Sequence, residues 1–396
     1  MNLSFDNTEI AFAYKSNKEL KQARWLFNTM DFGWLVSLGT RFTPFLMKTG
    51  LPIDGLVRKT IFKQFVGGET LEQTADIAKS LADYQVEVIL DYGVEGKEGE
   101  ANFDRAKEQF IKVINYAASQ KNIPFISIKV TGFARFELLR TLNEAPRLRS
   151  GVHDHEAESE EWDRVRDRMY EICEVAAEKG IGVLVDAEES WIQDPVDRLA
   201  MEMMEVFNHG KAVVYNTFQL YRHDRLQFLK ISHQIALQKG FILGVKLVRG
   251  AYMEKERKRA SELGYASPIQ PSKEASDADY NAAVVYSIEN LDNIAAIIAT
   301  HNEYSNKMAA ELLASRGVPL NHAHVHFSQL YGMSDNITFN LAKEGCSVSK
   351  YLPFGPIRDV IPYLMRRAQE NSSMSGQTGR ELSLIKKEMQ RRGILK

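Results

Sequence analysis

Polar side chains that could bind a small anion or a cofactor lie at the carboxyl ends of eight short apolar runs of the chain. In chain order they are Asp91, Lys129 with Thr131, Asp186 with Glu188 and Glu189, Gln219 with Tyr221, Lys246 with Arg249, Thr300 with His301 and Asn302, Gln329, and Tyr351. If the runs are parallel strands of one barrel, their carboxyl ends share one rim, where such groups converge on a site. Surface residues that merely end strands would not be expected to align in this way. We therefore expect a polar site at the strand ends.

Two adjacent arginines near the C-terminus could bind a carboxylate. Arg366 and Arg367 carry planar guanidinium groups whose paired N–H donors match a carboxylate in bidentate geometry. Both also lie within one helical turn of Glu370, so either arginine could form an ion pair on a solvated helix face. From these residues alone, the solvated ion pair is the simpler interpretation.

One pattern is typical of a metal site. His322, His324 and His326 alternate with apolar residues, so on a strand they would share one face. With Asp186 or His301 as a further ligand they suggest a zinc or iron barrel hydrolase. However, they would extend about 13 Å along a strand, too far for all three to bind one ion at its end. We predict no metal site and keep the metal-dependent barrel hydrolase as a minor alternative.

The elements that must position these residues alternate between short β-rich runs and longer helical stretches, which is typical of a parallel sheet. The predicted strands are 86–90, 125–130, 181–185, 212–217, 242–248, 295–300, 322–327 and 346–352. Eight strand-helix units indicate an α/β fold, a (β/α)₈ barrel of the TIM type. An open doubly wound sheet is the structural competitor.

Amphipathic stretches predict the intervening helices. They cover 162–178, 195–207, 225–238, 278–291, 305–316 and 357–369. Residues 10 to 82 also read as helices, interrupted at Gly50-Leu51-Pro52 and at Gly67-Gly68. We therefore predict an N-terminal helical arm over residues 1–82 and the barrel over residues 83–396.

Composition excludes several classes of protein. With 50 basic and 52 acidic residues the formal net charge is -2, so the overall charge of the protein would not attract nucleic acid.

The only cysteines, Cys173 and Cys346, are far apart, which suits a reducing compartment and buried thiols. The N-terminus has no secretory or transit pattern, which predicts a cytoplasmic protein. The apolar stretch Phe32–Met47 is too short to span a bilayer but could touch a membrane surface.

Phosphate-binding and nucleophile motifs are missing from the sequence: it contains no GxGxxG after a strand, GxxxxGK[ST], HExxH, GxSxG or CxxC. A nucleotide cofactor would therefore be held by the barrel and not by a Rossmann crossover.

Several motifs resemble those of proline dehydrogenases. The C-terminal run Tyr351-Leu-Pro-Phe-Gly-Pro, followed by Tyr363-Leu-Met-Arg366-Arg367-Ala-Gln-Glu370, is similar to the signature of that family. Further matches are KLVRGAY from Lys246, VDAE from Val185, TFQLY from Thr217, ATHN from Ala299 and QLYGM from Gln329. They occur in the family's order over residues 60 to 382.

The resemblance implies a distorted (β/α)₈ barrel that holds FAD across the strand ends, with the final helix over the active site. It implies that Arg366 and Arg367 bind a proline carboxylate, which reverses the simpler interpretation above. The substrate pocket would be completed by Lys129, Asp186, Tyr252, Leu330 and Tyr351. The flavin or its nucleotide tail would contact Gln219, Lys246, Arg249, Gly250, Ala251, Thr300, His301, Asn302 and Glu370. Glu69 resembles an acidic residue that pairs with the arginines as a gate.

The implied reaction is oxidation of L-proline to 1-pyrroline-5-carboxylate on FAD, the first step of proline catabolism, with electrons passed to a quinone. The resemblance also implies a separate downstream pyrroline-5-carboxylate dehydrogenase and peripheral contact with the inner face of the cytoplasmic membrane. Hydroxyproline oxidation is the nearer alternative. In one departure from many bacterial members, which read RLVKGAYW, this chain has Lys246, Arg249 and Met253. The cation beside the flavin ring would then be a lysine.

Overall fold

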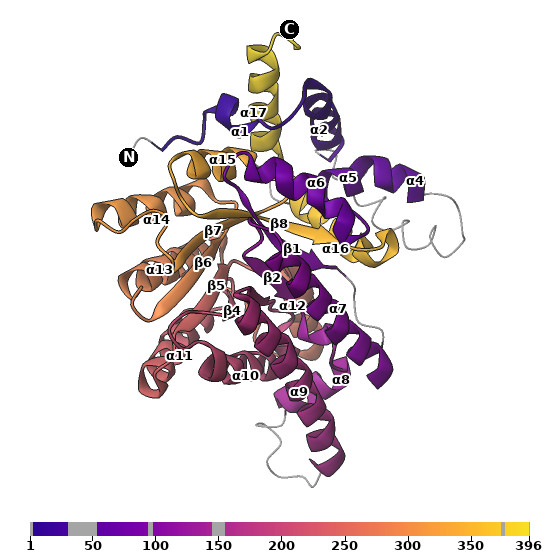
Figure 1. Cartoon of the computed structure of the whole chain (residues 1–396), viewed down its shortest axis with the longest axis vertical. Helices are drawn as coiled ribbons and strands as arrows, with labels where there is room; N and C mark the ends of the chain where they lie inside the picture. The colour runs from indigo at the N-terminus through magenta and orange to yellow at the C-terminus, as the bar shows by residue number, and fades with distance from the viewer. Residues whose placement is uncertain (1–2, 31–53, 94–97, 145–154, 374–376, 396) are drawn as a thin grey trace. The chain divides into compact units, whose positions relative to one another are not determined.

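The computed structural model describes residues 3–30, 54–93, 98–144, 155–373 and 377–395 (Figure 1). Within its helices and strands, the structure does not describe the side chains of residues 30, 54, 56, 155–159, 368–373 and 377–378. The apolar stretch Phe32–Met47 lies outside the described residues.

Eight strands form a closed barrel in chain order, β1 to β8 (Figure 1). Their bounds are β1 Glu87–Tyr92, β2 Phe125–Ile128, β3 Gly182–Val185, β4 Val214–Gln219, β5 Leu243–Val248, β6 Ile294–Ala299, β7 Val325–Leu330 and β8 Val348–Phe354. The pairs β1–β8, β2–β3, β3–β4, β4–β5 and β5–β6 are parallel, and Glu87 of β1 pairs with Ser349 of β8. The (β/α)₈ barrel predicted from the sequence is confirmed. Strands covered on both faces read as continuous apolar runs, and β6, with the sequence IAAIIA, is the clearest case.

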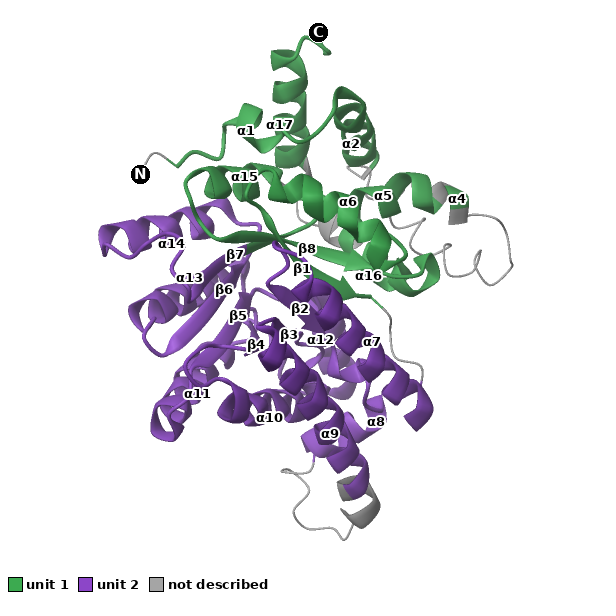
Figure 2. Cartoon of the chain, viewed as in Figure 1, with its two compact units in different colours: residues 1–94, 328–396 green, residues 95–327 purple. Residues whose placement is uncertain are grey.

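The chain divides into two compact units, which Figure 2 colours green and purple. Unit 1 contains residues 1–94 and 328–396, and unit 2 contains residues 95–327. The boundary that the sequence predicts at residues 82 and 83 stays a prediction.

Unit 2 holds the strands from β2 to the first part of β7 with their helices. The helices are α7 Glu100–Ala118, α8 Phe136–Glu144, α9 His155–Lys179, α10 Ser190–Phe207, α11 Arg225–Lys239, α12 Met253–Leu263, α13 Lys273–Glu289 and α14 Glu303–Ser315. Helix α9 shows why they form: Val165, Met169, Ile172 and Ala176 recur at helical spacing and are buried. The helix is followed by Gly180, which adopts a positive φ of 72°.

Unit 1 brings the N-terminal helices together with the C-terminal ones. Its helices are α1 Thr8–Ala11, α2 Asn17–Met30, α4 Asp54–Val57, η1 Arg58–Phe62, α5 Lys63–Phe65, α6 Leu71–Ala82, α15 Asp335–Lys343, α16 Ile357–Ser373 and α17 Gln377–Arg391. Phe12, Phe27 and Phe65 share one apolar core with Leu364 and Ile385. The N-terminal segment is therefore held by burial against α16 and α17.

The predicted start of the seventh strand is wrong by three residues. Strand β7 begins at Val325, because His322 and His324 lie in a turn in which the Val325 N–H donates to the His322 carbonyl. His324 Nδ1 lies 2.6 Å from the Leu291 carbonyl oxygen, which occupies that ring nitrogen. Burial lowers the pKa of His326 to about 3, so this imidazole stays neutral beside Phe125.

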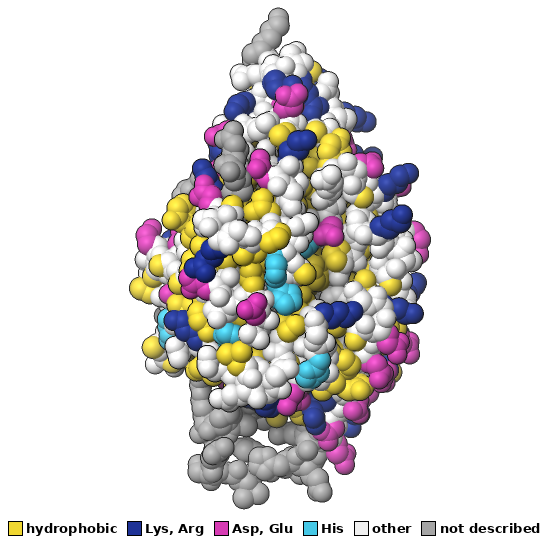
Figure 3. Space-filling view, turned by 60° about the vertical axis from the view of Figure 1, so that its left-hand side comes forward, with side chains coloured by type: hydrophobic (Ala, Val, Ile, Leu, Met, Phe, Trp, Pro, Cys, Tyr) yellow, Lys and Arg dark blue, Asp and Glu magenta, His cyan; other side chains and the backbone are white. Residues whose placement is uncertain are grey.

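The structure shows where the cysteines and the charged side chains lie. Cys173 and Cys346 are both buried free thiols, as predicted. Basic and acidic side chains are interspersed over the face drawn in Figure 3. Across the described ranges, no helix combines the length and apolar character needed to cross a bilayer. These same ranges contain no group of three or more His, Cys, Asp or Glu side chains that could hold a metal ion.

Candidate active site at the strand ends

The ends of β2, β3 and β5 bring three predicted site residues into contact. Lys129, directly after β2, places its ammonium 2.8 Å from Asp186 Oδ2. Lys246 of β5 donates to the other carboxylate oxygen, Oδ1. Ser127, two residues before Lys129, also donates to Oδ1 at 2.6 Å. One carboxylate is thus shared by two cations in a mostly buried setting, and we call these four residues the lysine-aspartate cluster.

The charges of this cluster determine its protonation. Burial alone would raise the pKa of Asp186, but Lys129 and Lys246 hold it far below its usual range. Asp186 therefore remains ionised at any physiological pH. Two ammonium groups against one carboxylate leave an excess of one positive charge, which suits an anionic ligand or developing negative charge.

A second carboxyl lies two residues further along, in a different environment. The Thr131 hydroxyl lies 2.8 and 2.9 Å from the two carboxyl oxygens of Glu188. Burial raises the pKa of Glu188 to about 7, opposed by the Lys129 charge and by the Thr131 hydrogen bond. The segment after β3 therefore carries one carboxyl that is permanently charged and one that titrates near neutrality.

Arg249, the residue after β5, is held by contacts to three elements. Its guanidinium donates from Nε to Asp277 of α13 at 2.6 Å and from Nη1 to the Thr300 hydroxyl at 2.7 Å. Nη2 donates to Ser305 of α14 at 3.1 Å, and the group stacks over the Tyr280 ring, 4.3 Å from its centroid. The site thus presents a guanidinium in a fixed orientation.

The next residues form a turn that only glycine can begin. Gly250 has a φ of 138°, and a Cβ there would lie 2.5 Å from the Tyr221 ring. Ala251 is exposed, and the half-buried Tyr252 precedes α12. The backbone of Gly250 therefore packs directly against the Tyr221 ring, which leaves no room for a side chain at the first position of this turn.

The remaining predicted residues of unit 2 lie at the ends of β4 and β6. Gln219 is the last residue of β4 and is buried. Thr300 follows β6 and accepts from Arg249, while His301 is half-buried. Asn302 caps α14, because its side chain accepts from the Ser305 N–H at 3.0 Å.

The predicted site residues of unit 1 lie on β7, β8 and α16. Leu330 ends β7, and the half-buried Tyr351 lies within β8, where its carbonyl accepts from the Tyr331 N–H at 2.9 Å. On α16, Arg366 is half-buried and Arg367 is buried, with its guanidinium 5.2 Å from the Tyr363 ring centroid.

Two sequence predictions in unit 1 stay untested. The predicted ion pair to Glu370 concerns a side chain outside the described ones. Glu69 forms an ion pair of 2.7 Å with Arg58, and its role as a gate stays a prediction.

The sequence analysis did not identify Ser127, Asp277 and Ser305, which form hydrogen bonds with the predicted site residues. Ser127 carried a usable signal, since it lies two positions before Lys129 and so shares its strand face. No sequence pattern points to Asp277 or Ser305, because these residues contact Arg249 from helices that lie far from it along the chain.

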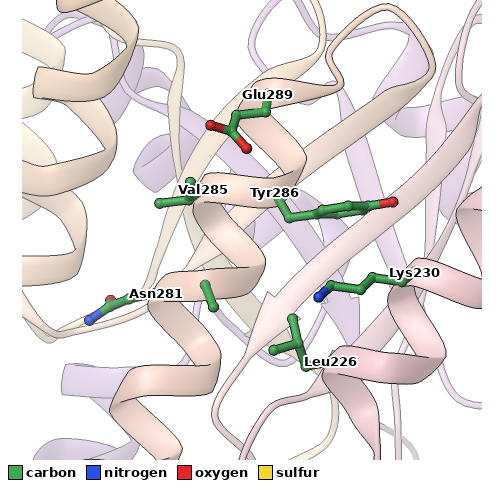
Figure 4. Close-up of a pocket in the computed structure, with 7 residues that line it drawn as sticks. Leu226, Lys230, Asn281, Val285, Tyr286 and Glu289 are labelled. Atoms are coloured by element: carbon green, nitrogen blue, oxygen red, sulfur yellow. The ribbon is translucent and has the colours of Figure 1, made fainter.

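A separate pocket of about 360 Å³ lies on unit 2, between α11 and α13 (Figure 4). Figure 4 shows Leu226 and Lys230 on one helix opposite Asn281, Val285, Tyr286 and Glu289 on the other. None of its lining residues is a predicted site residue. Helix α13 does carry Asp277 near its first turn, so the pocket and the Arg249 contacts lie on the same helix.

A closed parallel barrel with a buried charged cluster at its strand ends has the architecture of a barrel enzyme. Comparisons with known proteins narrow this class. A family model described as proline dehydrogenase matches residues 74–380. The chain belongs to the proline dehydrogenase family, a family of oxidoreductases.

Individual relatives span most of the chain. It is 38% identical over 328 residues to a carbapenem antibiotics biosynthesis protein of Pectobacterium carotovorum, covering 83% of both chains. It is 31% identical to mitochondrial proline dehydrogenase 1 of Arabidopsis thaliana, covering 97% of this chain and 85% of the relative. It is 29% identical to a hydroxyproline dehydrogenase of Xenopus laevis, covering 98% and 90%.

The fold also matches solved structures. The crystal structure of proline utilization A from Bdellovibrio bacteriovorus, inactivated by N-propargylglycine, aligns with a TM-score of 0.71 at 20% identity. The match covers 98% of this chain but 39% of that one, and at this identity it supports the fold alone.

Proposed function

We propose that this protein oxidises L-proline to 1-pyrroline-5-carboxylate with FAD as the electron acceptor. Membership of the proline dehydrogenase family supports the substrate class. The observation that carries the proposal is the lysine-aspartate cluster, in which Lys129 and Lys246 share the Asp186 carboxylate. Its excess positive charge suits a reaction in which negative charge develops on the acceptor.

Substrate binding is assigned to residues at the strand ends and on α16. Arg366 and Arg367 would bind the proline carboxylate through their paired N–H donors. Lys129, Asp186 and Tyr252 would line the pocket together with Leu330 and Tyr351. Fixing the carboxylate sets the distance and the face of the ring, which is the main contribution that positioning makes to such a reaction.

The cofactor assignment fits the residues at the ends of β5 and β6. Gly250 carries no side chain and adopts a φ of 138°, so no Cβ of its own would shield the backbone of this turn from a ligand. Arg249 supplies an oriented cation, and the N-terminus of α14 at Asn302 is favourable for a phosphate group. When bound, FAD supplies the hydride acceptor. The full set of proposed cofactor contacts is Gln219, Lys246, Arg249, Gly250, Ala251, Thr300, His301, Asn302 and Glu370.

Within this set, Lys246 has the most defined task. Asp186 cannot accept a proton at neutral pH, because two ammonium groups stabilise its charge. Its role is therefore to orient Lys129 and Lys246 and to reduce the repulsion between them. Lys246 would place its charge beside the acceptor, where it stabilises the product of electron transfer.

Further partners belong to the same proposal. The electrons pass to a quinone, with peripheral contact of the protein on the inner face of the cytoplasmic membrane. The product then passes to a separate pyrroline-5-carboxylate dehydrogenase. We infer a cytoplasmic location and a place at the first step of proline catabolism.

Anaerobic titration of the purified protein tests the proposal. We expect a yellow protein with flavin absorbance that bleaches on addition of L-proline. A protein that carries stoichiometric zinc and no flavin would overturn both cofactor and substrate. The 29% identity to a hydroxyproline dehydrogenase favours hydroxyproline as the second candidate substrate. Faster bleaching by hydroxyproline than by L-proline would support that candidate.

A further inference from the structure

Three carboxyl groups follow β3 within four residues, and their partners differ. Asp186 forms ion pairs with Lys129 and Lys246, and Glu189 forms one with Lys255. Glu188, between them, lies in no ion pair with any residue that the structure describes. The hydroxyl of Thr131 lies close to both of its oxygens. Glu188 is therefore the carboxyl of this segment whose charge no directly bound cation stabilises.

The position of Glu188 is nevertheless fixed. Its backbone N–H donates to Gln193 Oε1 of α10 at 2.8 Å, and Gln193 in turn donates to Asp197 at 2.9 Å. The Glu188 residue is 8% exposed. A carboxyl that is fixed, nearly buried and bound by a single neutral hydroxyl can gain or lose a proton without breaking an ion pair.

We propose that Glu188 accepts the proton that the substrate amine must lose before its oxidation. This inference rests on the proposed function and deepens it. In the first step the secondary ammonium gives H⁺ to the Glu188 carboxylate, leaving a neutral amine with a lone pair and a neutral carboxyl. In the second, the C–H bond next to nitrogen breaks, both electrons leave with the hydrogen for the flavin, and the lone pair forms C=N. The protonated imine is the product, and Glu188 later returns its proton to water.

The charges facing Glu188 support this assignment. Lys129 from the end of β2 lowers its pKa, whereas Asp186 and Glu189 from its own segment raise it, and Thr131 contributes a hydrogen bond. With Glu188 ionised, the charges of Lys129, Lys246, Asp186 and Glu188 cancel. When Glu188 takes up the proton, the group gains one positive charge as negative charge reaches the acceptor. Proton uptake therefore compensates electron transfer within one group of side chains.

The test is the pH dependence of kcat/KM for L-proline with the flavin-loaded wild type and Glu188→Gln. For the wild type we expect kcat/KM to fall on the acid side of about pH 7, with a slope of about one logarithmic unit per pH unit. We call this fall the acid limb of the pH profile. For Glu188→Gln we expect the acid limb to be absent, and kcat/KM at pH 8 to be lower than in the wild type by roughly 10²-fold or more. An acid limb that persists unchanged in Glu188→Gln overturns the proposal.

Glu381→Gln is the matched control. Glu381 is also buried, accepts from the Ser334 N–H, and has its pKa raised by burial to about 7. This variant should keep the limb. Thr131→Val provides a second variant of Glu188's environment, because loss of the hydroxyl should move the limb upward by about half to one pH unit. Thr131→Ser should leave it in place.

A spectroscopic measurement checks the step without relying on rates. Infrared difference spectra between the resting and the proline-reduced protein should contain a protonated carboxyl band that is absent in Glu188→Gln and present in Glu381→Gln. A band that persists in Glu188→Gln contradicts the proposal. If L-proline does not bleach the wild-type flavin at all, the proposed function fails; if Glu188→Gln bleaches like the wild type at every pH, only this inference fails.

Discussion

Lys246 of β5 donates to Oδ1 of Asp186, the residue that directly follows β3, and the Lys129 ammonium donates to the other oxygen of the same carboxylate. Because one buried carboxylate serves two cations, its loss leaves two ammonium groups facing each other. We expect Asp186→Asn to lower the free energy of unfolding by about 3–5 kcal/mol, measured by urea denaturation at pH 7. Asp163→Asn, at an ion pair on the surface of α9, is the control and should change it by less than about 1 kcal/mol.

The ion pairs of Asp186 with Lys129 and Lys246 also predict how the stability of the protein depends on pH. The folded-state pKa of Asp186 lies below its unfolded value of about 3.9, so its stabilising contribution is fully present above that pH. The contribution is lost as the pH falls below about 4, when the unfolded state binds a proton that the folded state does not. Between pH 5 and 3 the wild type should therefore lose more stability than Asp186→Asn. Parallel curves for the two proteins would contradict the assignment.

The arginine pair on α16 predicts a defect in substrate binding. Replacing Arg366 or Arg367 with Met removes a charged donor to the proline carboxylate, which contributes about 1.5–3 kcal/mol. We expect KM for L-proline to rise about 10- to 150-fold in each variant, with the flavin content retained. Arg380→Met, on α17, removes a guanidinium that pairs with Asp6 and serves as the control. Unchanged proline kinetics in both α16 variants would remove these residues from the substrate site.

Gly250 predicts a defect in cofactor binding that a comparison of two glycines can isolate. Gly250→Ala places a methyl group against the Tyr221 ring and in a positive-φ conformation, so the turn must shift. Gly264→Ala imposes a positive φ of 71° but meets nothing within 4 Å. We expect both variants to lose about 1 kcal/mol of stability or more, and only Gly250→Ala to lose flavin on gel filtration. Equal retention of flavin would separate this turn from the cofactor.

A buried ion pair in unit 1 predicts unequal costs for its two partners. Asp335 of α15 lies 2.9 Å from Lys350 of β8 and 3.1 Å from Lys15, and both Asp335 and Lys350 are almost inaccessible to solvent. Asp335→Asn leaves two cations without their carboxylate and should cost about 3–5 kcal/mol in thermal or urea unfolding. Lys350→Met leaves Asp335 paired with Lys15 and should cost less. Lys343→Met, at an exposed position of α15, is the control.

The barrel could be predicted because parallel strands buried on both faces leave apolar runs that stand out between charged helices. The polar residues that follow these runs identified Lys129, Asp186 and Lys246 before any contact was known. The start of β7 could not be predicted, because the alternation of His322, His324 and His326 resembles a strand although the first two lie in a turn.

Partners contributed by distant helices were also hidden in the sequence. Glu256 lies in the charged stretch MEKERKRASEL, yet it is fully buried and accepts from both the N–H and the hydroxyl of Ser190 at the start of α10. Asp277 reaches Arg249 in the same way. Local pattern indicates which face of an element is buried, but it does not indicate which distant side chain will meet it.

The division of the chain into two units has a consequence for biosynthesis. Unit 2 is one continuous stretch, residues 95–327, whereas unit 1 needs both residues 1–94 and residues 328–396. All of unit 2 is translated before β8, the partner of β1, is made. Until α16 and α17 are translated, the apolar side chains of the first 94 residues lack part of their native core. Phe12, Phe27 and Phe65 are among them. Nascent chains stalled before residue 348 should accordingly depend on chaperones more than the completed protein does.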